Sequence, residues 1–85
     1  MTKHILITGA AGAIGSALCE KFSMLYPHAH LTLIDINETA LQKKTSALSG
    51  KAGYAVWDLF KPESLATQWQ SVTDAHGPVD ILVNC

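Results

Sequence analysis

Arginine is absent from this chain, and all six of its basic residues are lysines. No guanidinium is therefore available for the bidentate recognition of a phosphate. The net charge of -1 gives no electrostatic reason to expect nucleic acid or a membrane surface as a partner. The first apolar run is four residues long, which is too short for a secretory segment or a membrane span. We expect a cytoplasmic protein that binds neither nucleic acid nor a membrane.

Cysteine is scarce, and its spacing excludes the usual cysteine sites. Cys19 and Cys85 lie 66 positions apart, so the chain has neither a redox pair of the CxxC type nor a zinc knuckle. We expect both cysteines to be reduced and structural. His28 and His30 have the chemistry to ligate a metal, but no third ligand lies nearby in the sequence. We therefore expect no metal site.

Repeats, low-complexity tracts and linkers are also missing, which predicts one small domain over residues 1–85. What the chain does have is a series of short apolar runs of the kind that form buried strands. Strands are expected at Ile5–Thr8, Leu31–Ile34, Tyr54–Trp57 and Val79–Val83.

Amphipathic segments separate these runs. The first carries apolar residues at helical spacing from Ile14 to Leu25 and is stopped by Tyr26 and Pro27. The second runs from about Glu38 to Ser49, with Gly50 placed to end it, and the third begins with Pro62 in its first turn and ends at Gly77 and Pro78. Leu65, Trp69 and Val72 form the apolar stripe of the third helix.

This alternation, with no hairpin turn signals, predicts an α/β fold in which helices cover both faces of a parallel sheet. Right-handed crossovers then favour a Rossmann-type, doubly wound sheet with strand order 3-2-1-4. A ligand is expected in the crevice between the carboxyl ends of the first and fourth strands.

The segment from Thr8 to Gly15, which links the first strand to the first helix, contains three glycines. Glycines at such a turn let the backbone approach a pyrophosphate, and the helix start offers unpaired N–H groups to it. Asp35 follows Gly15 by twenty residues at the end of the second strand, the distance at which an acidic residue reaches the ribose of NAD. The alternative is a turn required only by close packing of helix and strand.

Three further residues have two interpretations each. Trp57 and Trp69 could stack on an adenine ring, but we expect both to pack in the core. Asp58 lies at the carboxyl end of the third strand. It either contacts the cofactor, which we favour, or caps the helix that begins near Pro62.

Four motifs together resemble the short-chain dehydrogenase/reductase family. The segment from Thr8 to Gly15 is similar to the family's glycine signature, and Asp35 ends a strand similar to the one that carries its ribose-binding acid. Trp57-Asp58-Leu59 resembles the Asp-hydrophobic pair that holds the adenine, and the segment from Asp80 to Cys85 resembles the opening of the Asn-x-Ala-Gly element.

The resemblance implies an NAD-dependent oxidoreductase that transfers a hydride between the cofactor and a carbonyl or alcohol substrate. It also implies the set of cofactor-binding residues: Gly9, Ala11, Gly12, Ala13, Ile14, Gly15, Asp35, Ile36, Asp58, Leu59, Asn84 and Cys85. Two other functions remain open. The spacing of the glycines, with Ala13 between Gly12 and Gly15, resembles the pattern of the extended branch, which contains sugar-nucleotide epimerases and dehydratases. The other possibility is a non-catalytic nucleotide-binding module.

The family's Ser, Tyr-x-x-x-Lys and second Asn have no counterparts in these residues, so we predict no catalytic residue in this chain. It resembles the N-terminal cofactor-binding portion of a reductase, truncated after the fourth strand. The resemblance implies that the parent acts on a small-molecule substrate and forms a homo-oligomer.

Overall fold

Strands and helices alternate along the chain in the computed structural model, which describes residues 3–48 and 51–85. The elements are β1 (His4–Thr8), α1 (Ala13–Leu25), β2 (His30–Asp35), α2 (Glu38–Ala47), β3 (Lys51–Val56), the short 3-10 helix η1 (Pro62–Ser64), α3 (Leu65–His76) and β4 (Ile81–Val83). All three strand pairings are parallel, and the order is β3-β2-β1-β4. The predicted fold class and strand order are confirmed.

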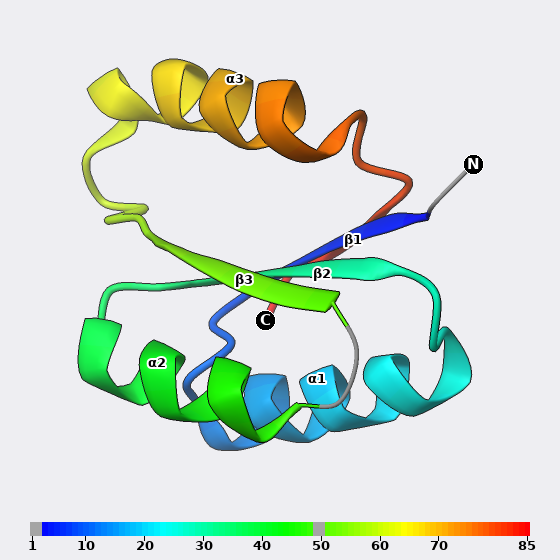
Figure 1. The fold of residues 1–85 in the computed structure, drawn as a ribbon. Coiled ribbons are helices and arrows are strands. Elements are labelled where there is room, and N and C mark those ends of the chain that lie inside the picture. The colour runs from blue at the N-terminus through cyan, green and yellow to red at the C-terminus, as the bar shows by residue number, and fades with distance from the viewer. Residues whose placement is uncertain (1–2, 49–50) are drawn as a thin grey trace.

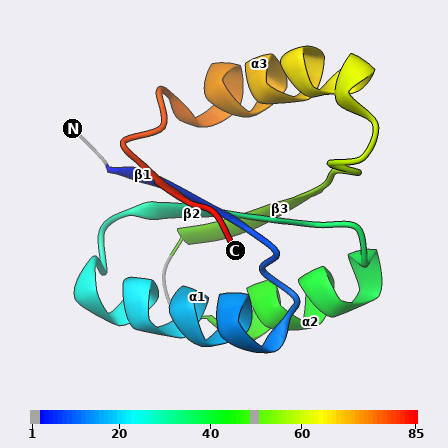
Figure 2. The same cartoon turned by 180° about the vertical axis from the view of Figure 1, so that it is seen from behind.

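Helices cover both faces of this sheet, with α1 and α2 on one side and α3 on the other (Figure 1). Side chains alternate between the faces of a strand, so Ile5 and Ile7 of β1 pack in the core under α1 and α2 while Leu6 packs in the core under α3. Figure 2, seen from behind, brings β4 and the last residues of the chain to the front. No helix of the described residues is long and apolar enough to cross a membrane.

The buried face of α1 differs from the apolar stripe of its sequence. Gly15, Cys19 and Ser23 are buried, whereas Ile14 is 74% exposed and Leu25 is also exposed. Gly15 has no side chain, so the start of the helix lies directly against the turn after β1. The face with the smallest residues therefore meets the sheet, and the larger Ile14 and Leu25 face solvent.

Several element boundaries also differ from the expected ones. β3 begins at Lys51 rather than Tyr54 because backbone pairing with β2 starts at the His30 and Lys51 positions. β4 is shorter than Val79–Val83, since Asp80 donates its N–H to the carbonyl of His4 before the ladder begins at Ile81. Pro62 opens a 3-10 turn, and the α-helix follows from Leu65.

The ends of α1 and α3 agree with the sequence signals, whereas α2 ends at Ala47, before the predicted end at Ser49. Leu48 caps α2, and the predicted last residue Ser49 and stop signal Gly50 lie outside the described residues. Gly77 caps α3 with a φ of 85°, a left-handed conformation that favours glycine.

The two tryptophans have different environments. Trp57 is 6% exposed and packs with Leu6, Ile34 and Val72, which confirms the core interpretation. Trp69 is 39% exposed, so the prediction that it belongs to the core was wrong. Within the described part of the chain α3 is the one α-helix on its face, and Leu65 and Val72 supply its contact with the sheet. A side chain beside that narrow stripe has no second helix to cover it.

Three histidines gather at the amino-terminal edge of the sheet. His4 is buried and fully hydrogen bonded: Nδ1 lies 2.9 Å from the carbonyl oxygen of Gly77, and Nε2 lies 2.7 Å from Oγ1 of Thr32. His30 stacks on His76, with ring centroids 3.7 Å apart. Nε2 of His30 is buried with no hydrogen-bond partner among the described residues. In the same residues no group of three or more His, Cys, Asp or Glu is placed to hold a metal ion.

This cluster predicts a loss of stability in mild acid. Burial, and then the charges of His76, His4 and Lys51, lower the pKa of His30 from 6.5 to about 4. In the unfolded chain His30 is protonated near pH 6.5, whereas in the folded chain it stays neutral down to about pH 4. The free energy of unfolding therefore decreases as the pH is lowered from about 6.5 to about 4. The full shift corresponds to about 3 kcal/mol, and solvent screening of a partly buried ring reduces the expected loss between pH 7 and pH 5 to about 1–2 kcal/mol.

Urea unfolding at the two pH values measures this loss. His30→Phe keeps a ring at the position and removes the titrating group, so this variant should lose less stability on acidification than the unmodified chain. An equal loss in both proteins would contradict the assignment to His30.

Candidate functional site

Backbone geometry explains two glycines of the turn between β1 and α1. Gly9 has a φ of 63°, and a Cβ added there would lie 2.8 Å from the backbone oxygen of Cys85. A Cβ on Gly15 would lie 2.1 Å from the backbone oxygen of Gly9. Close packing of the helix start against the turn therefore requires a glycine at position 15. Gly12 is different, because its Cβ would meet one atom, the Gly9 oxygen, at 3.4 Å.

The start of α1 opens onto this turn. Gly12 is the N-cap residue, and no side chain of the described residues caps it. The turn is closed by hydrogen bonds from the N–H of Gly12 to the carbonyl of Gly9 and from the N–H of Ala10 to the carbonyl of Ile34. The first N–H groups of a helix have no partner within it and carry its positive dipole end, so this arrangement suits an anion.

Asp35, at the end of β2, is hydrogen bonded to the glycine turn. Its Oδ2 accepts from the N–H of Ala11 at 3.0 Å, and its Oδ1 accepts from the N–H groups of Ile36 at 2.7 Å and Asn37 at 3.2 Å. A carboxylate has about four acceptor sites, so one remains for a ligand hydroxyl. The carboxylate therefore both fixes the turn and offers a negative acceptor beside it.

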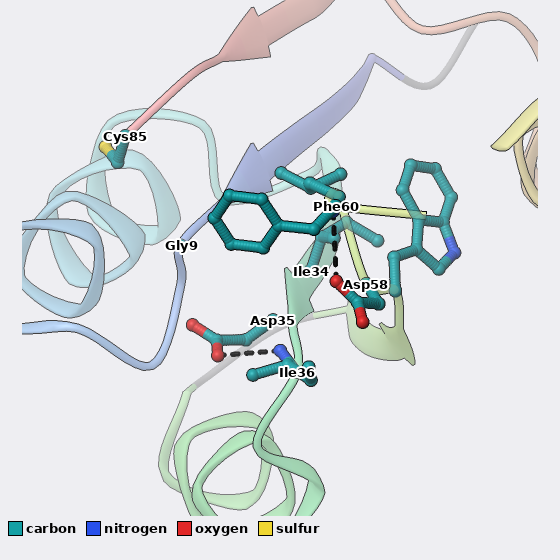
Figure 3. Close-up of a pocket in the computed structure, with 9 residues that line it drawn as sticks. Gly9, Ile34, Asp35, Ile36, Asp58, Phe60 and Cys85 are labelled. Carbon is teal, nitrogen blue, oxygen red and sulfur yellow. Dashed lines mark hydrogen bonds between the residues drawn. The ribbon is translucent and has the colours of Figure 1, made fainter. Parts of the chain in front are cut away.

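A pocket of about 160 Å³ lies over the carboxyl ends of β1, β2 and β3 (Figure 3). Its lining combines a buried apolar floor, an exposed apolar rim and two carboxylates: Gly9, Ile34, Asp35, Ile36, Trp57, Asp58, Leu59, Phe60 and Cys85. Pockets that hold a whole drug-sized ligand measure roughly 300–1,000 Å³. The space suits one ring system of a larger ligand.

Asp58 shapes the outer wall of this pocket. Its Oδ1 accepts from the N–H of Phe60 at 3.0 Å, and its carbonyl accepts from the N–H of Lys61 at 3.0 Å. The helical turn that follows has Lys61, not Asp58, as its N-cap residue. The capping alternative is therefore wrong, because the carboxylate of Asp58 accepts from the N–H of Phe60, which precedes the helical turn, and, within the described residues, from no N–H group of that turn.

The β1–β4 side of the sheet is occupied by the chain itself. Oγ1 of Thr8 donates to Oδ1 of Asn84 at 2.8 Å and accepts from the N–H of Cys85 at 3.1 Å. The pocket lies mainly over β2 and β3, and it reaches the expected crevice between β1 and β4 only at Gly9 and Cys85. Asn84 joins two strand ends and is not among the lining residues.

Six of the predicted site residues line the pocket: Gly9, Asp35, Ile36, Asp58, Leu59 and Cys85. Ala11, Gly12, Ala13, Ile14 and Gly15 lie in the adjoining turn and the first turn of α1. Their contacts with a cofactor stay predictions. Sequence reasoning missed Ile34 and Phe60, and it assigned Trp57 to packing alone. Phe60 had one signal, a large apolar residue in a loop just after a strand end.

The two cysteines differ in exposure, and neither forms a disulfide. Cys19 is buried, and burial raises the pKa of its thiol to about 11, which keeps it protonated. The structural interpretation holds for Cys19. It was wrong for the side chain of Cys85, which is exposed and borders the pocket because it follows the end of β4.

Comparison with known proteins places this geometry in a family. The family model for short chain dehydrogenases matches residues 3–85. An uncharacterised oxidoreductase of Bacillus subtilis is 33% identical over 96% of this chain and 12% of its own length. A short chain dehydrogenase/reductase of Macrophomina phaseolina is 33% identical over 96% of this chain and 48% of its own.

Solved structures give the same result. A short chain dehydrogenase from Mycobacterium smegmatis superimposes with a TM-score of 0.83 and 27% identity, over 99% of this chain and 36% of that one. A Haemophilus influenza protein described as a D-mannonate oxidoreductase, solved with bound NAD, has a TM-score of 0.77 and 30% identity, over 94% of this chain and 29% of that one. This chain thus spans less than half the length of each of these relatives, and it belongs to the short chain dehydrogenase family with a Rossmann-type fold.

Proposed function

We propose that this chain binds NAD for an oxidoreductase, with the adenosine end in the pocket and the pyrophosphate at the start of α1. One observation carries the proposal: Asp35, the end of the glycine turn and an apolar pocket adjoin one another at the carboxyl ends of β1 and β2. An anion site beside a hydroxyl acceptor and an apolar slot matches the chemistry of a dinucleotide. The bound NAD of the Haemophilus influenza relative supports the same assignment.

Each part of the site has a role in this proposal. The N–H groups at the start of α1 would hold the pyrophosphate, and the free acceptor site of Asp35 would take a ribose hydroxyl. Asp58 and Leu59 would hold the adenine. When bound, NAD supplies a hydride acceptor at its nicotinamide ring. For a protein of its relatives' length, the proposal adds a small-molecule substrate and a homo-oligomeric assembly.

Calorimetric titration of the purified chain with NAD tests the proposal. We expect saturable binding of one NAD per chain. Absence of saturable binding in a chain that circular dichroism shows to be folded would contradict it.

We also expect the chain to show no dehydrogenase turnover of its own. General acid–base catalysis of this kind contributes about 10²–10⁴-fold and needs a proton donor beside the reacting oxygen. Tyr54 is hydrogen bonded to Gln42 and Glu38, and Tyr26 stacks on Phe22, so neither tyrosine borders the pocket. His4 and His76 lie at the opposite end of the sheet.

Absorbance of reduced nicotinamide, followed with a panel of alcohols and carbonyls, measures this turnover. Activity that follows the chain through purification and disappears in Gly9→Val would contradict the expectation. The Gly9→Val variant is chosen because its new side chain meets the backbone of Cys85 at the pocket wall.

A further inference from the structure

Phe60 is the most exposed large apolar residue of the described chain, with 95% of its surface accessible. It nevertheless borders the pocket, on the rim that also contains Ile36 and Leu59. In Figure 3 its ring extends from the segment after Trp57 over the pocket, toward the side where Gly9 lies. A phenylalanine in this position contributes almost nothing to the core of the protein.

The backbone that carries this ring is held in place. The carboxylate of Asp58 accepts from the N–H of Phe60, and the carbonyl of Asp58 accepts from the N–H of Lys61. Trp57, directly before this turn, is anchored in the core under α3 and donates its own N–H to the carbonyl of Asp35. The turn is therefore fixed at both ends, and the backbone from which the Phe60 side chain starts has a defined position beside the pocket.

An exposed apolar rim around a pocket indicates a surface that a ligand covers. The pocket floor is apolar, because Ile34 and Trp57 are buried beneath it. A flat, aromatic ligand can be enclosed between such a floor and a ring on the rim, and aromatic rings stack on the faces of nucleobases whatever their hydrogen-bonding edges.

We propose that Phe60 is a binding residue that closes over the adenine of the dinucleotide and stacks on it, so that it determines affinity for the purine end of the ligand. This proposal rests on the proposed function and adds a residue to it. The ring gains its contacts only when the base is present, so it acts on binding and not on folding.

The test separates these two effects. Phe60→Ala should leave the urea unfolding midpoint unchanged, because an exposed side chain away from packing contacts usually alters stability by less than about 0.5 kcal/mol. The affinity for AMP and for NAD should fall by roughly five- to 150-fold, the range that corresponds to base–aromatic stacking. Phe60→Tyr, which keeps the ring face, should retain affinity close to that of the unmodified chain.

Two controls make the result specific. Nicotinamide mononucleotide has a ribose phosphate but no purine, so Phe60→Ala should not change its affinity. Met24→Ala removes a side chain that is 74% exposed on α1 and outside the pocket, and it should change no affinity. Trp57 fluorescence reports binding in a Trp69→Phe background, since Trp57 lines the pocket and Trp69 does not.

The outcomes are distinguishable. If the unmodified chain binds NAD and Phe60→Ala binds AMP and NAD equally well, the stacking role is wrong while the proposed function stands. If the unmodified chain binds neither NAD nor AMP, both fail. If Phe60→Ala changes the sedimentation of the chain and leaves nucleotide affinity intact, the rim is a protein contact and the proposal is overturned.

Discussion

Gly12→Asp is expected to weaken NAD binding strongly while the chain folds as well as before or better. Gly12 is the N-cap of α1, with φ -75° and ψ 170°, and no side chain of the described residues caps this helix. Aspartate is among the preferred N-cap residues and exceeds glycine by a few tenths of a kcal/mol. A negative charge in the first turn also interacts favourably with the helix dipole. The added Cβ meets the Gly9 oxygen at 3.4 Å, so little must move.

The same charge opposes the ligand. Two unit charges 4 Å apart interact by about 4 kcal/mol at an effective dielectric constant near 20. A carboxylate at the proposed pyrophosphate site should therefore weaken NAD binding by at least about 100-fold. Stability and affinity thus move in opposite directions, which a general disturbance of the fold would not produce.

Gly12→Asn is the matched control. Asparagine has nearly the shape of aspartate and caps helices equally well, but it has no charge. Its unfolding midpoint should be close to that of Gly12→Asp, lower only by the interaction of the charge with the helix dipole, and its NAD affinity, measured by calorimetry, should be much higher. Equal dissociation constants for the two variants would show that the start of α1 does not face the phosphates.

Substitutions of the other two glycines of the turn do not separate an effect on NAD binding from an effect on folding. Gly9→Val would place a side chain on a residue with positive φ and against the backbone of Cys85, so it disturbs the local fold along with any ligand. A side chain at Gly15 would require α1 to move away from the Gly9 carbonyl. The structure therefore makes Gly12 the position in this turn where binding and folding can be separated.

Local patterns were sufficient to predict the elements that lie at the centre of the sheet. β1 and β2 are continuous apolar runs because both of their faces are covered, and their predicted and observed bounds differ by a residue at the ends. β3 begins with Lys51, Ala52 and Gly53, which carry no strand signal of their own. These residues are in a strand because β2 offers them a hydrogen-bonding edge, a tertiary effect that no window of sequence contains.

The candidate site likewise contains residues that local sequence predicts and contacts that only the packed structure shows. Gly9 and Asp35 were predictable from the sequence, because each lies at the carboxyl end of a strand whose apolar run is recognisable. The carboxyl ends of neighbouring parallel strands lie at the same edge of the sheet. The hydrogen bond from Ala11 to Asp35 spans 24 positions, and the cluster of His4, His30 and His76 joins three distant segments. Phe60 became a pocket residue through a turn held by the side chain of Asp58. Such contacts follow from how the elements pack, and residue type alone does not specify them.

Asp35 should make the chain select NAD over NADP by at least about 100-fold in dissociation constant. Its carboxylate lines the pocket, and one acceptor site remains after its three backbone hydrogen bonds. In the proposed complex a ribose hydroxyl would donate to that site, whereas a 2′-phosphate about 4 Å away would meet a repulsion of up to about 4 kcal/mol per unit charge. The chain contains no arginine to compensate this repulsion.

Asp35→Asn is the variant that tests this selectivity. Its amide oxygen keeps an acceptor for the N–H groups of Ile36 and Asn37, but its amide nitrogen, a donor, replaces Oδ2 opposite the N–H of Ala11. The hydrogen bond to the glycine turn is therefore lost, and the selectivity is measured as a ratio because a disturbed turn affects NAD and NADP alike. The ratio of NADP to NAD dissociation constants, measured by titration with both, should fall by at least about tenfold. Asp58→Asn neutralises the second carboxylate of the same pocket and should change that ratio less, because its charge would lie at the adenine and not at the ribose. Equal affinities of the unmodified chain for NAD and NADP would contradict the assignment, and an equal change in both variants would attribute the selectivity to the overall charge of the pocket.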